Sequence, residues 1–397
     1  MKNTPVLVVG AHPSHGLSMR RYARLLFEAY EAACPGSVLI EPSDWLSRRS
    51  PRLLRKWVAY AEKLLYFPFQ LRSVARNFPI VHIADHSDAI YQMFVPREKQ
   101  TIVTCHDVFA IRSAYGLIPE HKTRPTGRIL QASILRSLGR ANWLVAVSEG
   151  TRRDAKSIGL DPRRMVVIPN PVDDVFFQHP RIPYARAAND LEVFEAAQVT
   201  ERFALVVSSL GWRKRRWLAI EWWIAASSSP EFYGLPLKIV GPPLDPDELE
   251  IVRRENLEAR VEVLADIDDG RLVSLYVDAA MLIQASRYEG FCWPIVEANA
   301  CGTLAVCADE PVIRDTGAGN VFVSADSVPD WRVVRDAAQS DHLLSKLHER
   351  SRSYSTARFR ASVAELAASV SPNAVRLDGR HRPVPHRDAS DETEGLV

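Results

Sequence analysis

The sequence has no run of 18 uninterrupted apolar residues, the length that a membrane-spanning helix needs, so we expect no transmembrane helix. Its N-terminus enters a strand-like run, Val6–Val9, without the pattern of a signal peptide. Cysteine is scarce: there are 5 residues, none spaced as C-x-x-C, and an odd number does not indicate a disulfide framework. These absences favour a protein of the reducing cytoplasm.

Strong net charge is also absent, since the 397 residues sum to +2, which is too little to predict nucleic acid as a partner. No repeat of solenoid length is present. The run Val6–Val9 is not followed by G-x-G-x-x-G, which argues against a nicotinamide-dependent dehydrogenase. Apolar residues make up 47% of the chain and charged residues 25%, so we expect an ordinary globular protein long enough for two domains.

Apolar runs of strand length alternate with helical apolar spacing along both halves, which predicts an α/β fold with two Rossmann-like domains facing a cleft. The predicted strands span residues 6–9, 80–84, 101–105, 143–147, 165–168, 203–208, 237–241, 261–264, 279–283 and 305–307. The predicted helices include residues 19–33, 217–227, 270–280, 294–301 and 341–369. Residues 179–202 lose this periodicity and are predicted to form a linker.

The stretch from 285 to 302 organises the rest of the chain. Glu289 and Glu297 are separated by a glycine-containing turn and by Pro294, which suits the first turn of a helix, and Gly302 suits the position just past its end. A strand, a loop and a helix in this order present backbone N–H groups to an anion such as phosphate. A carboxylate one turn into the helix can bind ribose hydroxyls, whereas the alternative is a pair of solvated or dipole-complementing acids.

Two further segments place charged or titratable groups at strand ends. Residues 213–216 are four consecutive cations between a strand and a helix, where they would favour a diphosphate or form a solvated basic turn. His106 and Asp107 follow the strand 101–105, at the edge where ligands collect in parallel sheets, although a histidine in this position is often structural. Cys105 is discounted as a partner of His106, because adjacent strand residues point to opposite faces.

The stretch 285–302 resembles the E-x7-E signature of glycosyltransferase family 4, the retaining GT-B enzymes of group 1, which reads roughly S-x-x-E-G-F-G-x-P-x-x-E-A-x-A-x-G. The matching residues are Ser286, Glu289, Gly290, Phe291, Pro294, Glu297, Ala298, Ala300 and Gly302. Cys292 stands where the family usually has glycine, and Ser209 where many members have an arginine. The segments T-x-H-D at 104–107 and I-P-N-P-V-D at 168–173 are similar to family segments as well.

The resemblance implies a role for each matching position. Lys214 and Arg213, with the loop residues Gly290, Phe291 and Cys292, would hold the donor diphosphate, and Glu297 the ribose. Glu289 would bind the sugar hydroxyls, and His106 would face the sugar from across the cleft. Gly16 and Ser18 match the glycine loop that lies between donor and acceptor. The catalytic set is thus His106, Glu289 and Lys214, and the resemblance implies no metal and no cofactor beyond the nucleotide-sugar substrate.

The same resemblance implies a domain division. Residues 1–178 would form the acceptor-side domain, 179–202 a linker and 203–345 the nucleotide-sugar-binding domain. Residues 346–370 would form a C-terminal helix that returns to the first domain, and 371–397 a disordered tail rich in proline and charge. We expect transfer of a hexose of the mannose or glucose type to a glycan or lipid-linked saccharide, in cell-surface polysaccharide or glycolipid biosynthesis. The alternative from another class is a non-catalytic GT-B protein that binds nucleotide sugar or a partner protein.

Residues 48–76 carry eight basic residues and a single acid, Glu62. Their apolar residues recur at helical spacing among several aromatic residues. A basic amphipathic helix of this kind can lie on an anionic membrane, which would place the protein at the inner face of the cytoplasmic membrane. The alternative is a helix that packs on its own domain and keeps a solvated basic face.

Overall fold

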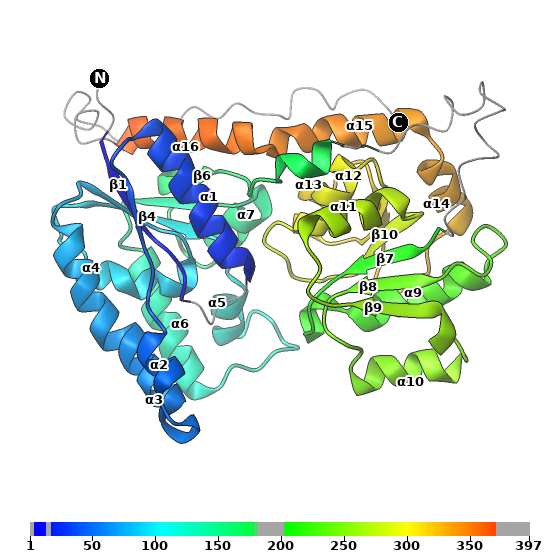
Figure 1. The fold of residues 1–397 in the computed structure, drawn as a ribbon, viewed down its shortest axis with the longest axis horizontal. Helices are drawn as coiled ribbons and strands as arrows, with labels where there is room; N and C mark the ends of the chain where they lie inside the picture. Colours follow the sequence, from blue (N-terminus) through cyan, green and yellow to red (C-terminus); the bar gives the residue numbers. More distant parts are fainter. Residues whose placement is uncertain (1–3, 13–16, 179, 181–201, 371–397) are drawn as a thin grey trace. The chain divides into compact units, whose positions relative to one another are not determined.

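The computed structural model describes residues 4–12, 17–178, 180 and 202–370, and the chain divides into two compact units. Unit 1 contains residues 1–147, 152–168 and 360–397, and unit 2 contains residues 148–151 and 169–359. Each unit is a six-stranded sheet of parallel strands with helices on both faces, so the predicted α/β class with two Rossmann-like units is confirmed (Figure 1). Nearly all of the predicted linker and the whole predicted tail lie outside the described residues.

The sheet of unit 1 has the order β2-β1-β3-β4-β5-β6. Its strands are β1 (Val6–Val9), β2 (Val38–Ile40), β3 (Ile80–Ile83), β4 (Gln100–Cys105), β5 (Trp143–Ala146) and β6 (Met165–Val167). The central strands are buried along their whole length, because helices cover both faces, and this is why they appear in the sequence as continuous apolar runs. The strand order reverses between β1 and β3, so the loops that follow these strands flank a topological switch point.

The sheet of unit 2 has the order β12-β11-β10-β7-β8-β9. Its strands are β7 (Ala204–Val207), β8 (Leu237–Val240), β9 (Val261–Leu264), β10 (Met281–Gln284), β11 (Ala305–Ala308) and β12 (Val321–Val323). Counted from β7, this is the doubly wound order 3-2-1-4-5-6, whose switch point lies between β7 and β10. Strand β7 precedes the cationic turn and strand β10 precedes the two-glutamate loop, so both segments begin at this switch point.

The main helices of unit 1 follow in chain order. They are α1 (Leu17–Ala33), α2 (Trp45–Arg49), α3 (Arg52–Ala61), the π-helix η1 (Glu62–Tyr66), α4 (Phe67–Ala75), the 3-10 helix η2 (His86–Phe94), α5 (Phe109–Ala114), α6 (Pro125–Leu138), α7 (Glu149–Ser157) and α16 (Thr356–Val370). Two of them, α7 and α16, have their first residues in unit 2 and the rest in unit 1. Arg360 of α16 lies 3.8 Å from Glu28 of α1, and both residues belong to unit 1. No helix in the described ranges is long and apolar enough to cross a bilayer.

The helices of unit 2 flank its sheet. They are α9 (Arg216–Ser228), α10 (Pro246–Arg254), α11 (Asp269–Asp278), α12 (Trp293–Ala300), α13 (Pro311–Thr316), α14 (Trp331–Ala338) and α15 (Asp341–Ser351). Two buried tryptophans of α9, Trp222 and Trp223, fill the core of the unit, and their indole N–H groups donate to backbone carbonyls at 3.0 and 2.9 Å. Gly241 follows β8 with φ +151, and a Cβ there would come within 2.1 Å of the Ser208 carbonyl, so only glycine permits this approach of two strand ends.

Two long predicted helical segments are interrupted in the structure. Residues 45–75 form four consecutive helical pieces, and Pro51 separates the first two, because it lacks an N–H and its ring clashes with a continuing helix. The segment 341–369 breaks near Ser355, whose backbone is extended and pairs with Val172. The edge strands β2 and β12 are absent from the sequence prediction.

Candidate functional site

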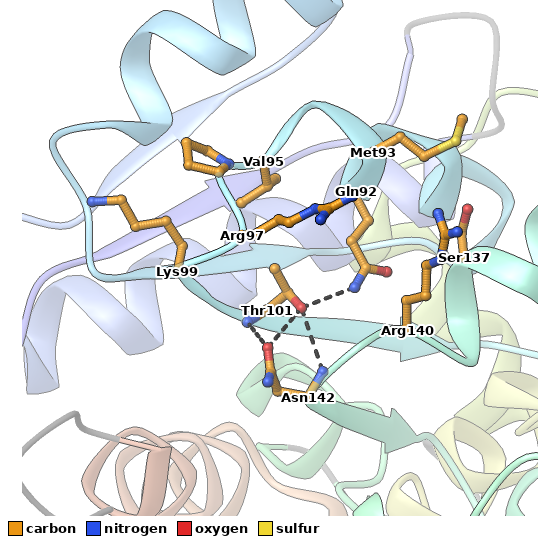
Figure 2. Close-up of a pocket in the computed structure, with 10 residues that line it drawn as sticks. Gln92, Met93, Val95, Arg97, Lys99, Thr101, Ser137, Arg140 and Asn142 are labelled. Carbon is orange, nitrogen blue, oxygen red and sulfur yellow. Dashed lines mark hydrogen bonds between the residues drawn. The ribbon is translucent and has the colours of Figure 1, made fainter.

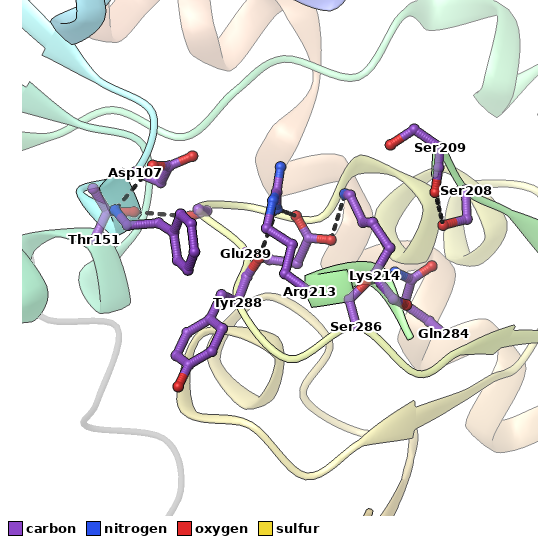
Figure 3. Close-up of polar contacts among 12 residues, drawn as sticks. Asp107, Thr151, Ser208, Ser209, Arg213, Lys214, Gln284, Ser286, Tyr288 and Glu289 are labelled. Carbon is purple, nitrogen blue, oxygen red and sulfur yellow. Dashed lines mark hydrogen bonds and ion pairs between the residues drawn. The ribbon is translucent and has the colours of Figure 1, made fainter. Parts of the chain in front are cut away.

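The turn after β7 carries four consecutive cations, and two of them lie against Glu289. Lys214 donates from Nζ to Oε1 of Glu289 at 2.6 Å, and Arg213 Nη1 lies 3.3 Å from Oε2 of the same carboxylate (Figure 3). Arg213 also donates to the carbonyl of Tyr288 at 2.7 Å. The two segments that the sequence analysis singled out, 75 residues apart, therefore meet at the switch point of unit 2.

The other two cations of this turn have structural partners. Arg216 is buried, pairs with the buried Glu248 and donates to two backbone carbonyls after β8 at 2.8 and 2.9 Å. Arg215 has the left-handed backbone conformation, with φ 45, and its guanidinium lies 3.4 Å from Glu310. The prediction that all four cations favour a diphosphate is therefore narrowed to Arg213 and Lys214.

Glu289 is held as a carboxylate by these cations. Burial by itself would raise its pKa, but the charges of Lys214 and Arg213 and the hydrogen bonds from Lys214 and Ser286 lower the pKa below its ordinary value. Only 8% of the Glu289 side chain is exposed, compared with 19% for Lys214 and 32% for Arg213. The cluster is thus a nearly buried acid beneath two partly exposed cations, which can face an anion.

The loop before α12 has an unusual backbone at Cys292, whose φ is 69. This is the left-handed region that glycine adopts without cost, so it gives a physical reason for the glycine that the family usually has here. The carbonyl of the preceding Gly290 accepts hydrogen bonds from the hydroxyls of Ser148 at 2.6 Å and Thr151 at 3.0 Å, and these residues also belong to unit 2. Phe291 is buried and packs edge-on against Trp293.

Helix α12 begins one residue earlier than predicted, at Trp293, so that Pro294 lies inside its first turn, and it ends before Gly302, which has φ +77. Glu297 lies one turn into this helix and is buried. The hydroxyl of Tyr276, from α11, donates to Oε2 of Glu297 at 3.0 Å. This contact fixes the orientation of the carboxylate that we predicted to bind ribose.

His106 lies in unit 1, directly after β4, and is buried. Its Nε2 lies 2.9 Å from the carbonyl of Ala84, which can only accept, so this nitrogen carries the proton. Burial lowers the pKa of His106, and its ring packs edge-on against Tyr22 with centroids 4.5 Å apart. The imidazole is therefore neutral at physiological pH, with Nδ1 as the unprotonated nitrogen.

The cysteines add no reactive group to this site, and the glycine loop is described only in part. Gly16 lies outside the described residues, and Ser18 is an exposed residue in the first turn of α1. All of the cysteines are free and buried, and burial raises the pKa of Cys105 to about 12 and that of Cys292 well above its ordinary range. Neither thiol is therefore a thiolate at neutral pH. Among the described ranges, no group of three or more His, Cys, Asp or Glu side chains could hold a metal ion.

A separate cavity of about 410 Å³ lies in unit 1 at the amino end of β4, at the opposite strand end from His106 (Figure 2). Its cationic lining residues are Arg97, Lys99 and Arg140, and Lys99 donates to a backbone carbonyl at the end of α4 at 2.7 Å. Thr101 forms its floor through hydrogen bonds with Asn142 and Gln92. None of the predicted site residues lines this cavity.

Sequence reasoning did not identify three residues that position the site. The Ser148 hydroxyl caps α7 by accepting from the Thr151 N–H at 3.0 Å, and it also donates to the loop carbonyl of Gly290. Thr151 and Tyr276 were not singled out. Their partners are 139 and 21 residues away in sequence, so no local pattern could have indicated these contacts.

A doubly wound sheet with a cationic turn and a helix N-terminus at its switch point is typical of nucleotide-binding α/β proteins. The model of Glycosyltransferase Family 4 matches residues 20–176, and that of Glycosyl transferases group 1 matches residues 190–327. The chain is therefore a GT-B glycosyltransferase of family 4, as the resemblance implied. The non-catalytic and dehydrogenase alternatives are set aside.

Two curated relatives are similar at low identity. The O-antigen chain mannosyltransferase B of Escherichia coli is 26% identical over 296 residues, which cover 72% of each chain. One of the subunits of phosphatidylinositol N-acetylglucosaminyltransferase from Arabidopsis thaliana is 24% identical over 291 residues, 68% of this chain. This chain spans only 60% of that relative's length.

Solved structures share the fold over most of the chain. Anabaena Alr3699/HepE, in complex with UDP and glucose, superposes with a TM-score of 0.66 at 16% identity, over 92% of this chain and 100% of that one. Sucrose-phosphate synthase from Thermosynechococcus elongatus gives a TM-score of 0.66 at 18% identity, over 92% and 99% of the two chains. These neighbours support the GT-B fold.

Proposed function

We propose that this glycosyltransferase moves a hexose of the mannose or glucose type from a nucleotide-sugar donor to a glycan or lipid-linked saccharide, with retention at the anomeric carbon. The proposed donor site rests on one observation, the contact of Lys214 and Arg213 with Glu289 at the switch point of unit 2. A mannosyltransferase of O-antigen and an enzyme named for phosphatidylinositol are among the relatives, which supports a role in cell-surface polysaccharide or glycolipid synthesis.

The proposed chemistry depends on stabilising the leaving nucleoside diphosphate. The bond between the anomeric carbon and a diphosphate oxygen breaks, the acceptor oxygen bonds to the same face of the carbon, and the acceptor proton passes to the departing diphosphate. Lys214, Arg213 and the N–H groups of residues 290–292 would stabilise the charge that develops on that diphosphate. The high pKa values of the buried thiols Cys105 and Cys292 argue against either as an enzymic nucleophile.

Each remaining residue has a proposed role. Glu297, oriented by Tyr276, would bind the ribose hydroxyls, and Glu289 would bind the sugar hydroxyls after Lys214 turns to the diphosphate. His106 would contact the sugar as a neutral imidazole. We propose that no metal is needed, because Lys214 and Arg213 would supply the positive charge that a metal ion would otherwise provide. Turnover should therefore persist in the presence of a chelator such as EDTA.

The donor site is tested with Lys214→Ala and a matched control, Lys346→Ala, whose lysine is exposed on α15. Calorimetric titration with UDP and GDP should show weaker binding to Lys214→Ala by about 10- to 100-fold, since a hydrogen bond to a charged group contributes about 1.5–3 kcal/mol. The control should bind as the wild type does. Equal affinities for all three proteins, with folding verified by circular dichroism, would reduce the turn to a solvated basic surface.

A further inference from the structure

The segment from Trp45 to Phe69 exposes large apolar side chains that a globular protein ordinarily buries. The exposed residues are Trp45, Leu46, Leu53, Leu54, Trp57, Leu65, Tyr66 and Phe69, and we call them the α2–α4 surface. Exposure reaches 91% for Leu53, 72% for Trp57 and 71% for Phe69. Contiguous apolar patches of this kind mark interaction sites in soluble proteins.

The exposure follows from the orientation of α3 and η1. The residues Leu54, Trp57, Val58, Ala61 and Leu65 occupy positions i, i+3, i+4, i+7 and i+11, so they form one helical stripe. An amphipathic helix usually turns such a stripe toward its own core, and that was the alternative considered from the sequence. Here the stripe faces outward instead, with only Val58 partly covered.

The segment is nevertheless attached to unit 1 through η1 and α4. Phe67 and Leu71 of α4 are fully buried, and Phe67 packs edge-on against Tyr91. Glu62 is also buried, and its two carboxylate oxygens accept from the N–H groups of Leu46 and residue 47 at 2.7 and 3.0 Å. The described side chains of α3 are exposed or half-buried, so the outward stripe lies on a helix that is held in place through η1 and α4.

A groove of about 320 Å³ runs within this surface. Its lining residues are Leu46, Val58, Ala61, Glu62, Leu65, Tyr66 and Phe69. Glu62 is the one carboxylate among them, and its oxygens accept hydrogen bonds from the backbone of α2. The groove wall is otherwise apolar or aromatic, which suits a hydrocarbon chain.

The charge around the α2–α4 surface is mainly positive, although Arg48 pairs with Asp44 and Lys63 with the buried Asp88. Residues 45–76 contain eight arginines and lysines and one acid, the buried Glu62. The exposed cations Arg55 and Arg72 follow the apolar positions Leu54 and Phe69 by one and three residues. The guanidinium of Arg49 lies 4.2 Å from the ring centre of Trp45, so cations and interfacial aromatic rings alternate on the same elements.

We infer that the α2–α4 surface docks on a leaflet of anionic phospholipid, with its apolar side chains among the acyl chains and one such chain in the groove. Trp57 and Tyr66 suit the headgroup level, where amphipathic rings collect, and the arginines attract the negative surface. A neutral protein partner would explain the apolar stripe but not the excess of positive charge around it. This inference concerns where the enzyme works, and it does not depend on the donor chemistry.

Vesicle flotation with the full chain tests the inference. Wild-type protein should float with vesicles of phosphatidylcholine and phosphatidylglycerol at low salt, and float less at high salt or with phosphatidylcholine alone. The double variants Trp57→Ser/Phe69→Ser and Arg55→Glu/Arg72→Glu should each lower the partition coefficient by about 10-fold or more. The control Ile129→Ser/Tyr233→Ser removes two other exposed apolar side chains and should float as the wild type does.

Three results of the flotation assay would overturn the inference: wild-type protein that does not float with anionic vesicles, flotation that the control lowers as much as the test variants do, or flotation that none of the variants lowers. Light scattering after gel filtration adds a further check. If Trp57→Ser/Phe69→Ser converts a dimer to a monomer, a second copy of the chain covers the surface, and the membrane inference fails. Nucleoside diphosphate binding, measured on the same variants, should stay unchanged, so failure here is distinct from failure of the donor site.

Discussion

Glu289→Gln is the substitution whose consequences the structure specifies most fully. The change keeps the shape of the side chain and removes the charge that faces Lys214 at 2.6 Å and Arg213 at 3.3 Å. In the ligand-free protein a diphosphate must compete with this carboxylate for the two cations. The variant should therefore bind free nucleoside diphosphate as tightly as the wild type or up to ~10-fold more tightly, whereas kcat falls because the proposed contact with the sugar is weakened.

The cost in stability can be bounded from the burial of the three side chains. Breaking a fully buried ion pair costs about 3–5 kcal/mol, and an exposed pair contributes about 0–1 kcal/mol. With Glu289 8% exposed but Lys214 and Arg213 19% and 32% exposed, we expect a loss of about 1–3 kcal/mol. For a unit of this size such a loss lowers Tm by about 2–12 °C.

The pH dependence gives an independent check on the same substitution. The pKa of Glu289 is lowered in the folded state, so its contribution to stability is present above the unfolded-state pKa and is lost as pH falls through the lower folded-state pKa. The difference in Tm between wild type and Glu289→Gln should therefore shrink in acid, beginning near the unfolded-state value of about 4.3. Glu221→Gln, an exposed position on α9, is the control and should show no such difference.

The assay combines calorimetry with free UDP or GDP, single-turnover release of the nucleoside diphosphate from the donor, and thermal unfolding from acid to neutral pH. Our reasoning would be refuted if Glu289→Gln bound free nucleoside diphosphate more weakly than the wild type, because Glu289 would then belong to the nucleotide subsite. An unchanged kcat in folded Glu289→Gln would show that Glu289 does not make the proposed contact with the sugar.

Three further predictions concern single sites. Glu297→Gln should weaken the binding of both the donor and free nucleoside diphosphate by about 10-fold, because both ligands contain the ribose. If calorimetry shows that Glu289→Gln loses as much affinity for nucleoside diphosphate, the two glutamates do not have separate roles. Arg216→Met should cost about 3–5 kcal/mol in urea unfolding by stranding the buried Glu248, and the further change Glu248→Leu should recover much of it. Burial lowers the pKa of His82 to about 3, so below about pH 6.5 the unfolded chain takes up a proton that the folded protein does not. The free energy of unfolding should therefore decrease as pH falls, and His82→Gln should reduce this slope by up to ~1.4 kcal/mol per pH unit.

Local sequence features predicted the elements of the site well. Pro294 and Gly302 bracket helix α12 as expected, because a proline inside the first turn and a glycine just past the end act through the backbone alone. The strands that precede the two key loops were recognised for a similar reason, since a parallel strand covered on both faces must be apolar throughout. Cys292 shows the limit of such rules, because its left-handed backbone is set by the surrounding loop.

The sequence by itself determined the alternation of strands and helices, the position of the two glutamates and the charge of the turn at 213–216, because each depends on neighbours within a few residues. Tertiary structure alone decided which cations of that turn face Glu289 and which are held by Glu248 and Glu310, since those partners are distant along the chain. It also decided that the apolar stripe of α3 faces outward. Periodicity defines the two faces of a helix, but the packing of neighbouring elements chooses which of them is buried.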